Sequence, residues 1–351
     1  MTAIGIDTHK GSLACCLVDD LGVPLDERTL PNDPAGLAAL VAWTRSLDPL
    51  PVVGLEGSAS YGAAAARALV AAGLEAREVP PMLSRRERRT TRRAGKSDPA
   101  DALAIARVVA RERELPPVRI EDPSTELGLL VSARDRLLAE ATRVRNGIHA
   151  QLLVLLPGYA ATAPNLVAAS HRRTVRGMLR GRTGVRADLV RADLDRLERL
   201  GREARTLERA ITVRVAGHPL LALPGCGVIV AATILGRVGD AGRIASHDRF
   251  AMLAGAAPVP ASSGQVRRMR LNRGGDRRLN RALWTMALTQ YRMHPPARAY
   301  VIRKRTEGKG WAEAIRCLKR HLARVVFHAL RAGASGTAGS SPAAALRGLT
   351  T

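Results

Sequence analysis

Residues 3–18 read AIGIDTHKGSLACCLV, and this stretch decides the fold expected for the N-terminal part of the chain. It holds two short apolar runs, Ala3–Asp7 and Ser12–Val18, joined by a polar link that ends in Gly11. Apolar runs on either side of such a link predict the two strands of a β-hairpin. The first run ends in Asp7. A charged residue directly after the apolar letters IGI is expected at the end of the strand, where its carboxylate is poorly solvated and needs a partner.

Strand and helix patterns alternate along the rest of the first third. Strands are predicted at Val23–Leu30, Pro51–Glu56 and Leu74–Val79, and helices at Gly36–Leu47, Tyr61–Ala72 and from Asp98 to about Arg113. This order predicts an α/β domain with a mixed sheet and flanking helices.

The middle of the chain has a helical period. Between Thr125 and Leu156, apolar residues recur at three- and four-residue steps, with Arg134 as the polar break in the stripe. The stripe consists of Leu127, Leu130, Leu137, Ala141, Val144, Ile148, Leu152 and Leu155. A second stripe consists of Leu194, Leu197, Ala204, Leu207 and Ile211. This coiled-coil-like pattern is compatible equally with an antiparallel pair inside one subunit and with a dimer, because it does not fix the partner.

A mainly α-helical domain is expected from about His218 onward. The letters LPGCGVIVAATIL within Leu220–Leu235 predict two apolar helical segments joined by a Pro-Gly-x-Gly turn. They indicate either a helix-hairpin-helix-like element, whose turn amides hold a phosphate, or a plain buried helical hairpin. Beyond Ala332 the composition is typical of a disordered tail. The expected domains are therefore residues 1–118, 119–215 and 216–332, followed by a tail at 333–351.

The net charge points to a polyanionic partner. The chain has 351 residues with 55 Lys and Arg against 31 Asp and Glu, a formal charge of +24. Such an excess is self-repulsive unless a polyanion neutralises it, and nucleic acid releases counterions when it does so. A genome rich in G and C explains a preference for Arg over Lys, but it does not explain an excess of Arg over Glu.

Several other protein classes are disfavoured. The four cysteines form no CxxC pair, so a zinc ribbon and a thioredoxin-type motif are not expected. The N-terminus lacks the basic segment of a signal peptide. The most apolar stretch, Leu220–Leu235, is too short for a membrane span and is interrupted by Pro and Gly. A cytoplasmic, nucleoid-associated bacterial protein is the expectation.

Four acidic residues have a spacing that predicts a metal site. Asp7 and Glu56 end predicted strands, and Asp98 and Asp101 open a predicted helix. Carboxylates that converge at one sheet edge would hold two divalent metals, Mg²⁺ or Mn²⁺, for an in-line displacement at phosphorus. Capping of the helix by Asp98 and Asp101, with Pro99 in its first turn, explains that pair equally well. Glu56 is also compatible with a loop start.

This set of acidic residues resembles the DEDD signature of a RuvC-like nuclease domain with the ribonuclease-H fold. With the C-terminal region, the chain is similar to the DEDD-type insertion-sequence transposases of family one-ten, from Ile4 to about Leu330. The resemblance implies metal binding by Asp7, Glu56, Asp98 and Asp101. It also implies an RNA-guided recombinase that uses a bridge RNA encoded by the element.

The resemblance also implies a serine nucleophile. Residues 250–283 read FAMLAGAAPVPASSGQVRRMRLNRGGDRRLNRAL, and the family's serine before glycine matches Ser263, with Ser262 as the alternative. From the residues alone, a flexible Ser-Gly loop is favoured over a nucleophile. A serine hydroxyl needs a base, a metal or electrostatic help to attack a phosphodiester.

Two basic runs flank the proposed catalytic elements and are expected to hold nucleic-acid phosphates without reading bases. The first consists of Arg85, Arg86, Arg88, Arg89, Arg92, Arg93 and Lys96. The second consists of Arg267, Arg268, Arg270, Arg273, Arg277, Arg278 and Arg281. A solvated surface is the ordinary explanation of such runs. Aromatic residues are only 3% of the chain, so stacking on bases is expected to be secondary.

The leading hypothesis is therefore a DNA transposase or recombinase that acts as a homodimer or homotetramer on element ends and target DNA. The first alternative is a structure-specific endonuclease, such as a junction resolvase, that uses water in place of Ser263. The second is a non-catalytic nucleic-acid-binding protein.

Overall fold

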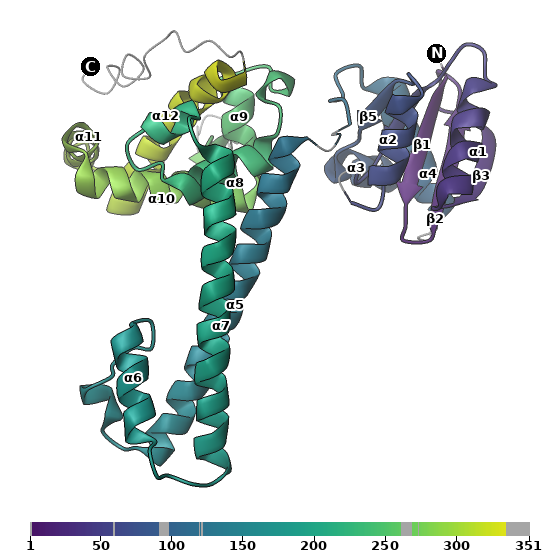
Figure 1. Cartoon of the computed structure of the whole chain (residues 1–351). Coiled ribbons are helices and arrows are strands. Elements are labelled where there is room, and N and C mark those ends of the chain that lie inside the picture. The colour runs from purple at the N-terminus through teal and green to yellow at the C-terminus, as the bar shows by residue number, and fades with distance from the viewer. Residues whose placement is uncertain are drawn as a thin grey trace. The chain divides into compact units, whose positions relative to one another are not determined.

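The computed structural model describes residues 2–58, 60–90, 98–118, 120, 122–260, 269–272 and 274–334. The chain forms two compact units, Met1–Glu121 and Asp122–Thr351. Figure 1 shows a sheet flanked by helices in the first unit and long helices in the second.

The first unit contains a five-stranded sheet in the order β3-β2-β1-β4-β5. Its strands are β1 (Ala3–Thr8), β2 (Ser12–Val18), β3 (Pro24–Pro31), β4 (Val52–Leu55) and β5 (Ala76–Glu78). The first three strands are antiparallel neighbours, whereas β4 lies parallel to β1 and β5 lies parallel to β4. The predicted hairpin and mixed sheet are both confirmed.

Helices cover both faces of this sheet. They are α1 (Pro34–Arg45), α2 (Ala63–Ala71), α3 (Pro81–Thr90) and α4 (Asp98–Arg111). Ile4 and Ile6 point to one face, where they share a core with Leu40 of α1 and Leu69 of α2. Alternate residues of β1 face α4, and a Cβ on Gly5 would lie 2.2 Å from the backbone nitrogen of Ala106. Glycine at this position lets α4 pack directly against β1.

Helix α3 was not predicted as a helix, because its sequence is dominated by arginine and has little apolar periodicity. The structure shows that it buries Ser84 and Glu87, whereas Arg85 and Arg86 are exposed. Glu87 is bound by Arg111 of α4 at 2.5 Å. Polar contacts to α4 thus take part in holding this helix in place.

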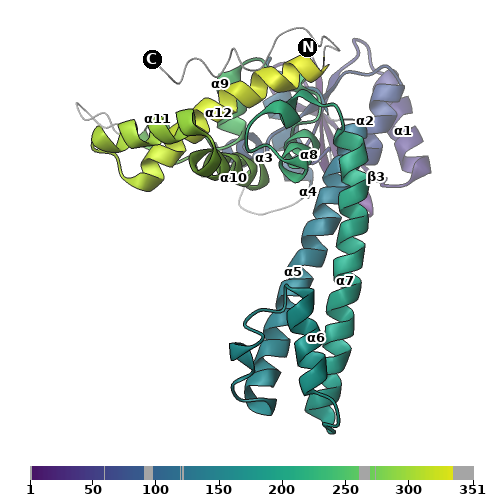
Figure 2. The same cartoon turned by 60° about the vertical axis from the view of Figure 1, so that its left-hand side comes forward.

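The second unit contains a long antiparallel helical pair, which Figures 1 and 2 show side by side. It consists of α5 (Pro123–Leu155) and α7 (Val185–Val215), with η1 (Tyr159–Ala161) and α6 (Ala169–Met178) at its far end. Arg134, the polar break in the first stripe, donates to Glu208 of α7 at 2.7 Å. The two helices therefore pair within one chain. This is the first of the two arrangements considered from the sequence, an antiparallel pair inside one subunit.

The remaining helices pack around one core. They are η2 (Pro219–Ala222), α8 (Val228–Val238), η3 (Ala241–Arg243), α9 (His247–Leu253), α10 (Arg277–Met293), α11 (Pro295–Thr306) and α12 (Trp311–Ala334). The short strands β6 (Val259–Pro260) and β7 (Met269–Arg270) pair with each other. The core includes Phe250 and Leu283 together with Leu127 of α5 and Ile211 of α7. The near end of the helical pair thus belongs to the same core as the C-terminal helices.

One detail of the predicted helix-hairpin-helix-like element was wrong. The first of its two helical segments is only the four-residue 3-10 helix η2, which starts at Pro219 and ends before Pro224. Proline lacks a backbone N–H and restricts the residue before it, so two prolines this close leave no room for a longer helix. Helix α8 forms as expected.

The described part of the chain contains no helix with the length and apolar character needed to cross a membrane. Of the predicted tail, 333–351, only residues 333 and 334 are among the described residues, and they end α12.

Candidate metal centre and basic surfaces

Asp7 and Glu56 lie at the same edge of the sheet. Their strands β1 and β4 are parallel neighbours, so the carboxyl ends of the two strands meet. The Glu56 backbone N–H donates to Ile6 at 3.4 Å, and the Thr8 hydroxyl donates to the Glu56 carbonyl at 3.1 Å. These bonds hold the two strand ends together just where the acidic side chains emerge.

Asp98 and Asp101 reach this edge from the first turn of α4. Asp98 is exposed, whereas only 6% of Asp101 is accessible to solvent. Because α4 packs along β1, its N-terminus comes to the strand end that carries Asp7. The positive end of the helix dipole favours carboxylates here.

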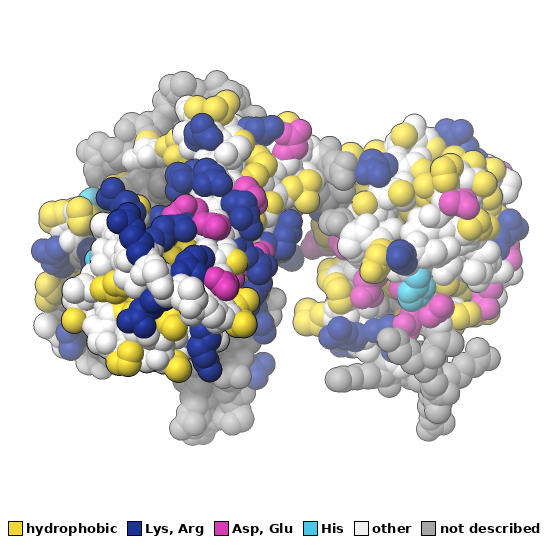
Figure 3. Space-filling model, turned by 60° about the horizontal axis from the view of Figure 1, so that its bottom comes forward, with side chains coloured by type: hydrophobic (Ala, Val, Ile, Leu, Met, Phe, Trp, Pro, Cys, Tyr) yellow, Lys and Arg dark blue, Asp and Glu magenta, His cyan; other side chains and the backbone are white. Residues whose placement is uncertain are grey.

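His9 completes this cluster and was not predicted as a site residue. Its Nε2 atom lies 3.2 Å from Oδ2 of Asp7 and 3.2 Å from Oδ1 of Asp98. One ligand atom from each of these three residues lies within 4.8 Å of the others. Figure 3 shows Asp and Glu side chains gathered around a histidine on one face of the first unit. The sequence signal was its position in GIDTHK, which was interpreted only as a hairpin link.

The electrostatics of Asp7 show that the four carboxylates act on one another. The pKa of Asp7 is raised, first by burial and then by the negative charges of Asp101, Glu56 and Asp98, while His9 opposes the rise. Like charges this close disfavour ionisation, and a cation among them would relieve the repulsion.

Helix α3 supplies partners for the other two acidic side chains. The Ser84 hydroxyl donates to Oε2 of Glu56 at 2.5 Å. A guanidinium nitrogen of Arg88 lies 2.6 Å from Oδ1 of Asp101. Arg88, expected to hold a nucleic-acid phosphate, is therefore paired with a member of the acidic cluster in this structure.

The residues fit a divalent metal. Carboxylate oxygens are the ligands that Mg²⁺ and Mn²⁺ prefer, and imidazole is a further ligand for softer ions. Burial and the same neighbouring carboxylates raise the pKa of Asp7, and a cation among them would relieve this repulsion. Asp7 and Asp98 are the best placed to hold an ion, together with His9, and Glu56 and Asp101 flank them.

Several predicted residues lie outside the described residues, so the structure does not test them. They are Arg92, Arg93, Lys96, Ser262, Ser263, Arg267, Arg268 and Arg273, and the side chain of Arg89 also belongs to this group.

The described part of the second basic run surrounds the start of α10. Arg270, Arg277 and Arg281 are exposed, and Arg278 donates to the Ser132 hydroxyl of α5 at 2.5 Å. Asp276 caps the helix by accepting from the Leu279 N–H at 2.8 Å. Helix α10 thus begins directly after Gly274, Gly275 and the capping Asp276. Figure 3 shows Lys and Arg side chains gathered on this unit.

Known proteins are similar to this chain along most of its length. A family model described as "Transposase" matches residues 4–157, and a model described as "Transposase IS116/IS110/IS902 family" matches residues 217–301. The insertion element IS900 uncharacterized 42 kDa protein of Mycobacterium paratuberculosis is 30% identical, over 93% of this chain and 95% of that protein. The chain belongs to the IS110 family of transposases. It is thus related to enzymes that move DNA.

Other relatives of this transposase cover similar lengths. The insertion element IS110 uncharacterized 43.6 kDa protein of Streptomyces coelicolor is 27% identical, over 94% of each chain. Among solved structures, T. thermophilus RuvC in complex with a Holliday junction substrate is 20% identical over 33% of this chain and 99% of that chain, with a TM-score of 0.27. Likeness at that level supports no conclusion about function.

Proposed function

We propose that this transposase cuts and rejoins DNA by phosphodiester transfer that depends on Mg²⁺ or Mn²⁺ bound at Asp7, Glu56, Asp98 and Asp101. The observation that carries the proposal is the convergence of these carboxylates, seen in the raised pKa of Asp7 and in the contacts of His9. Burial and mutual repulsion disfavour such an arrangement unless it serves a function.

The residues of the cluster have distinct roles in this proposal. Asp7 and Asp98 bind the ion, and His9 fixes the direction of both carboxylates. Ser84 orients Glu56, and Arg88 balances the charge of the buried Asp101. Divalent ions held by these residues would supply the positive charge that activates a nucleophile and stabilises the leaving oxygen at phosphorus.

The nucleophile in this proposal is Ser263, with Ser262 as the neighbouring alternative. Its hydroxyl oxygen forms a bond to phosphorus, the ester bond from phosphorus to a sugar oxygen breaks, and that sugar oxygen leaves with a proton. The phosphoserine conserves the bond energy for religation to a second strand. The family match over residues 217–301 and the exposed arginines beside α10 support this assignment.

A bridge RNA is proposed to choose the DNA sites. The chain is rich in cations that bind phosphates and has few aromatic residues, so pairing with a guide would supply the sequence specificity. Exchange between two duplexes requires several active sites, so a homodimer or homotetramer is proposed as the working form.

The test is denaturing electrophoresis of the full chain after incubation with element-end DNA, guide RNA and Mg²⁺. The wild type is expected to form a covalent protein–DNA adduct, which Ser263→Ala and Asp7→Asn both abolish. Thr162→Ala, a hydroxyl removed from the far end of the helical pair, serves as the matched control. Cutting that persists in Ser263→Ala without a covalent adduct would indicate a water-dependent endonuclease, whereas an adduct that persists would assign the nucleophile to Ser262. Transposition that persists in Asp7→Asn would indicate a non-catalytic role for the acidic cluster.

A further inference from the structure

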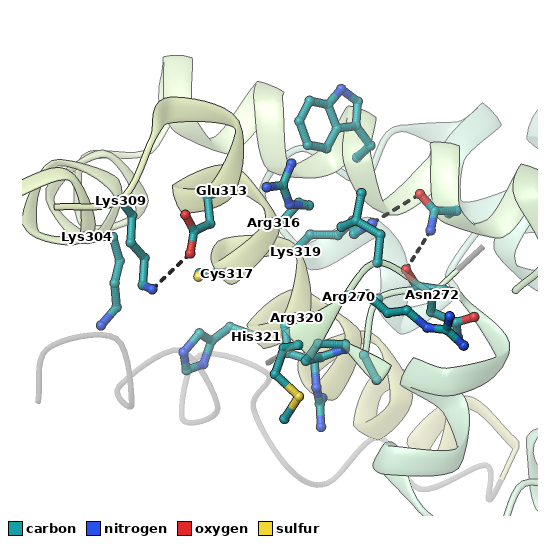
Figure 4. A pocket seen from close by; sticks show the side chains of 18 of the residues that line it. Arg270, Asn272, Lys304, Lys309, Glu313, Arg316, Cys317, Lys319, Arg320 and His321 are labelled. Carbon is teal, nitrogen blue, oxygen red and sulfur yellow. Dashed lines mark hydrogen bonds and ion pairs between the residues drawn. The ribbon is translucent and has the colours of Figure 1, made fainter. Parts of the chain in front are cut away.

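A cavity of about 950 Å³ lies within the second unit and shares no residue with the acidic cluster. It is bordered by residues 255–258, which precede β6, by β7 and by residues of α10, α11 and α12. Figure 4 shows the basic side chains from α11, α12 and β7 around it. None of them except Arg270 belongs to the basic runs recognised in the sequence.

The lining is strongly cationic. It includes Arg270, Lys304, Lys309, Arg316, Lys319 and Arg320. Three of these cations have carboxylate partners: Lys304 binds Glu307 at 2.7 Å, Lys309 binds Glu313 at 3.0 Å, and Arg320 pairs with Asp248. Within the described part of the chain, Arg270, Arg316 and Lys319 have no carboxylate partner.

Lys319 is the unusual member of this group, because only 5% of it is accessible to solvent. Its amine donates to Oδ1 of Asn280 at 3.1 Å. Burial and the positive charge of Arg316 lower the pKa of Lys319. A buried ammonium with only a neutral amide as its partner is unfavourable, and an anion in the cavity would stabilise it.

The amide that holds Lys319 is itself fixed. Asn280 donates to the carbonyls of Ala254 and Gly255, both at 2.8 Å, so its oxygen must face the lysine. Gly255 has a φ of +59° and packs so closely on Gly275 that a Cβ on Gly275 would lie 2.3 Å from the Gly255 nitrogen. Asn280 and the closely packed backbone around it thus fix the position of the Lys319 amine, as is typical of binding sites.

The pKa of His321 reflects the same excess of positive charge. Its pKa is lowered by burial and then by four cations of α11 and α12: Arg320, Arg324, Lys304 and Arg303. The field at the cavity therefore favours an anion, and a nucleic-acid phosphate is the anion that a transposase meets.

We propose that this cavity binds a backbone phosphate of DNA, with Lys319 as the buried ligand and Arg316 and Arg270 beside it. The assignment to DNA rests on the proposed function, because Pro258, directly before β6, and both residues of β7 line the cavity, and the sequence between these two strands contains Ser263. The cavity itself rests on the described residues alone.

The test measures binding of a fluorescent 20-base-pair DNA duplex to the full chain by anisotropy, in EDTA and at several salt concentrations. Lys319→Met keeps the length of the side chain and removes its charge. At 0.15 M salt it is expected to weaken binding about fivefold and to reduce the slope of log Kd against log salt by about 1, the effect of one lost phosphate contact. Arg205→Gln, which removes an exposed charge from α7, is the control and should leave both quantities unchanged.

Wild-type affinity and salt slope in folded Lys319→Met would overturn the proposal. The same titration is carried out with an RNA duplex of the same sequence, and a loss of affinity confined to that RNA would also overturn the proposal. Circular dichroism establishes the fold of the variant. If Lys319→Met does not fold, Arg316→Gln at the partly exposed neighbouring position decides by the same measurement. Because EDTA prevents metal-dependent cutting, these results stand whether or not Ser263→Ala abolishes the covalent adduct.

Discussion

The Nε2 atom of His9 lies 3.2 Å from Oδ1 of Asp98, so the link between β1 and β2 touches the first residue of α4. The same nitrogen lies 3.2 Å from Oδ2 of Asp7. His9 therefore joins two carboxylates that come from different elements of the fold. A side chain in this position fixes the orientation of metal ligands, and it is available as a ligand itself.

Replacing His9 by Ala is expected to weaken Mn²⁺ binding about 10- to 100-fold, the usual cost of losing a group that orients metal ligands. Isothermal titration calorimetry measures the dissociation constant. Lys10→Ala removes the exposed neighbour in the same link and should bind Mn²⁺ like the wild type. Equal affinities of the His9→Ala variant and the wild type would remove His9 from the site.

Asp7→Asn is expected to stabilise the metal-free protein. The pKa of Asp7 is raised in the folded state, so its stabilising contribution is present below the unfolded pKa and is lost as the pH rises through the folded pKa. At pH 7 the ionised carboxylate therefore destabilises the fold, and asparagine removes that charge. In EDTA, the melting temperature should rise by a few degrees, on the order expected for about 1 kcal/mol.

The same variant should lose its response to metal. A ligand at 100 times its Kd stabilises the folded state by about 2.7 kcal/mol, and wild-type protein should show this gain with Mn²⁺. Asp7→Asn should show little of it in the same thermal melts. A variant that melts lower in EDTA yet gains the full metal stabilisation would contradict the electrostatic account of the cluster.

Arg88→Gln tests how much the ion pair between Arg88 and Asp101 contributes to stability. Loss of the 2.6 Å ion pair leaves a buried carboxylate without its charged partner, so unfolding in EDTA should become easier by about 1–3 kcal/mol. Bound Mn²⁺ should restore most of this loss, because the ion supplies the missing positive charge. Urea titrations with and without Mn²⁺ measure both effects. Arg85→Gln replaces an exposed arginine on the same helix and should change neither the stability in EDTA nor the gain with Mn²⁺. If Arg88→Gln loses the same stability with and without Mn²⁺, the ion pair has a purely structural role.

The sheet of the first unit was predictable because its signals are local. Alternation within β1 places Ile4 and Ile6 on one face and Gly5 on the other, and the strand ends at a polar link. Helix α3 was missed because its contacts are polar and distant, such as Glu87 with Arg111. No apolar periodicity in residues 81–90 could have indicated it.

The candidate site was predicted in part for the same reason. Asp7 and Glu56 are visible as charges at the ends of apolar strands, and parallel pairing brings them together. The role of His9 depends on Asp98, which is far away in sequence, and that of Lys319 depends on Asn280 of another helix. A lysine inside a helical pattern gives no sign in the sequence that it is buried.

Glu208→Gln tests the pairing of α5 and α7 within one chain. Glu208 accepts from Arg134 at 2.7 Å, and only 18% of the arginine side chain is accessible. Removal of the carboxylate charge should lower the unfolding free energy by about 1 kcal/mol in urea. Glu203→Gln, at an exposed position of α7, should have no effect. A loss that grows with dilution would instead point to an interface between chains.

The second unit is expected to lose stability as the pH falls from 7.5 to 5.5. The pKa values of His218 and His321 are lowered in the folded state, mainly by burial. A base with a lowered folded pKa contributes stability above its unfolded pKa, and this is lost as the pH falls through that value and the unfolded chain takes up the proton. The Nδ1 atom of His218 accepts from the Leu220 N–H at 3.1 Å, and protonation removes that acceptor. His218→Asn offers an acceptor that does not titrate, so its urea midpoint should depend less on pH than that of the wild type. An unchanged pH dependence in both His218→Asn and His321→Gln would show that other groups govern the acid response.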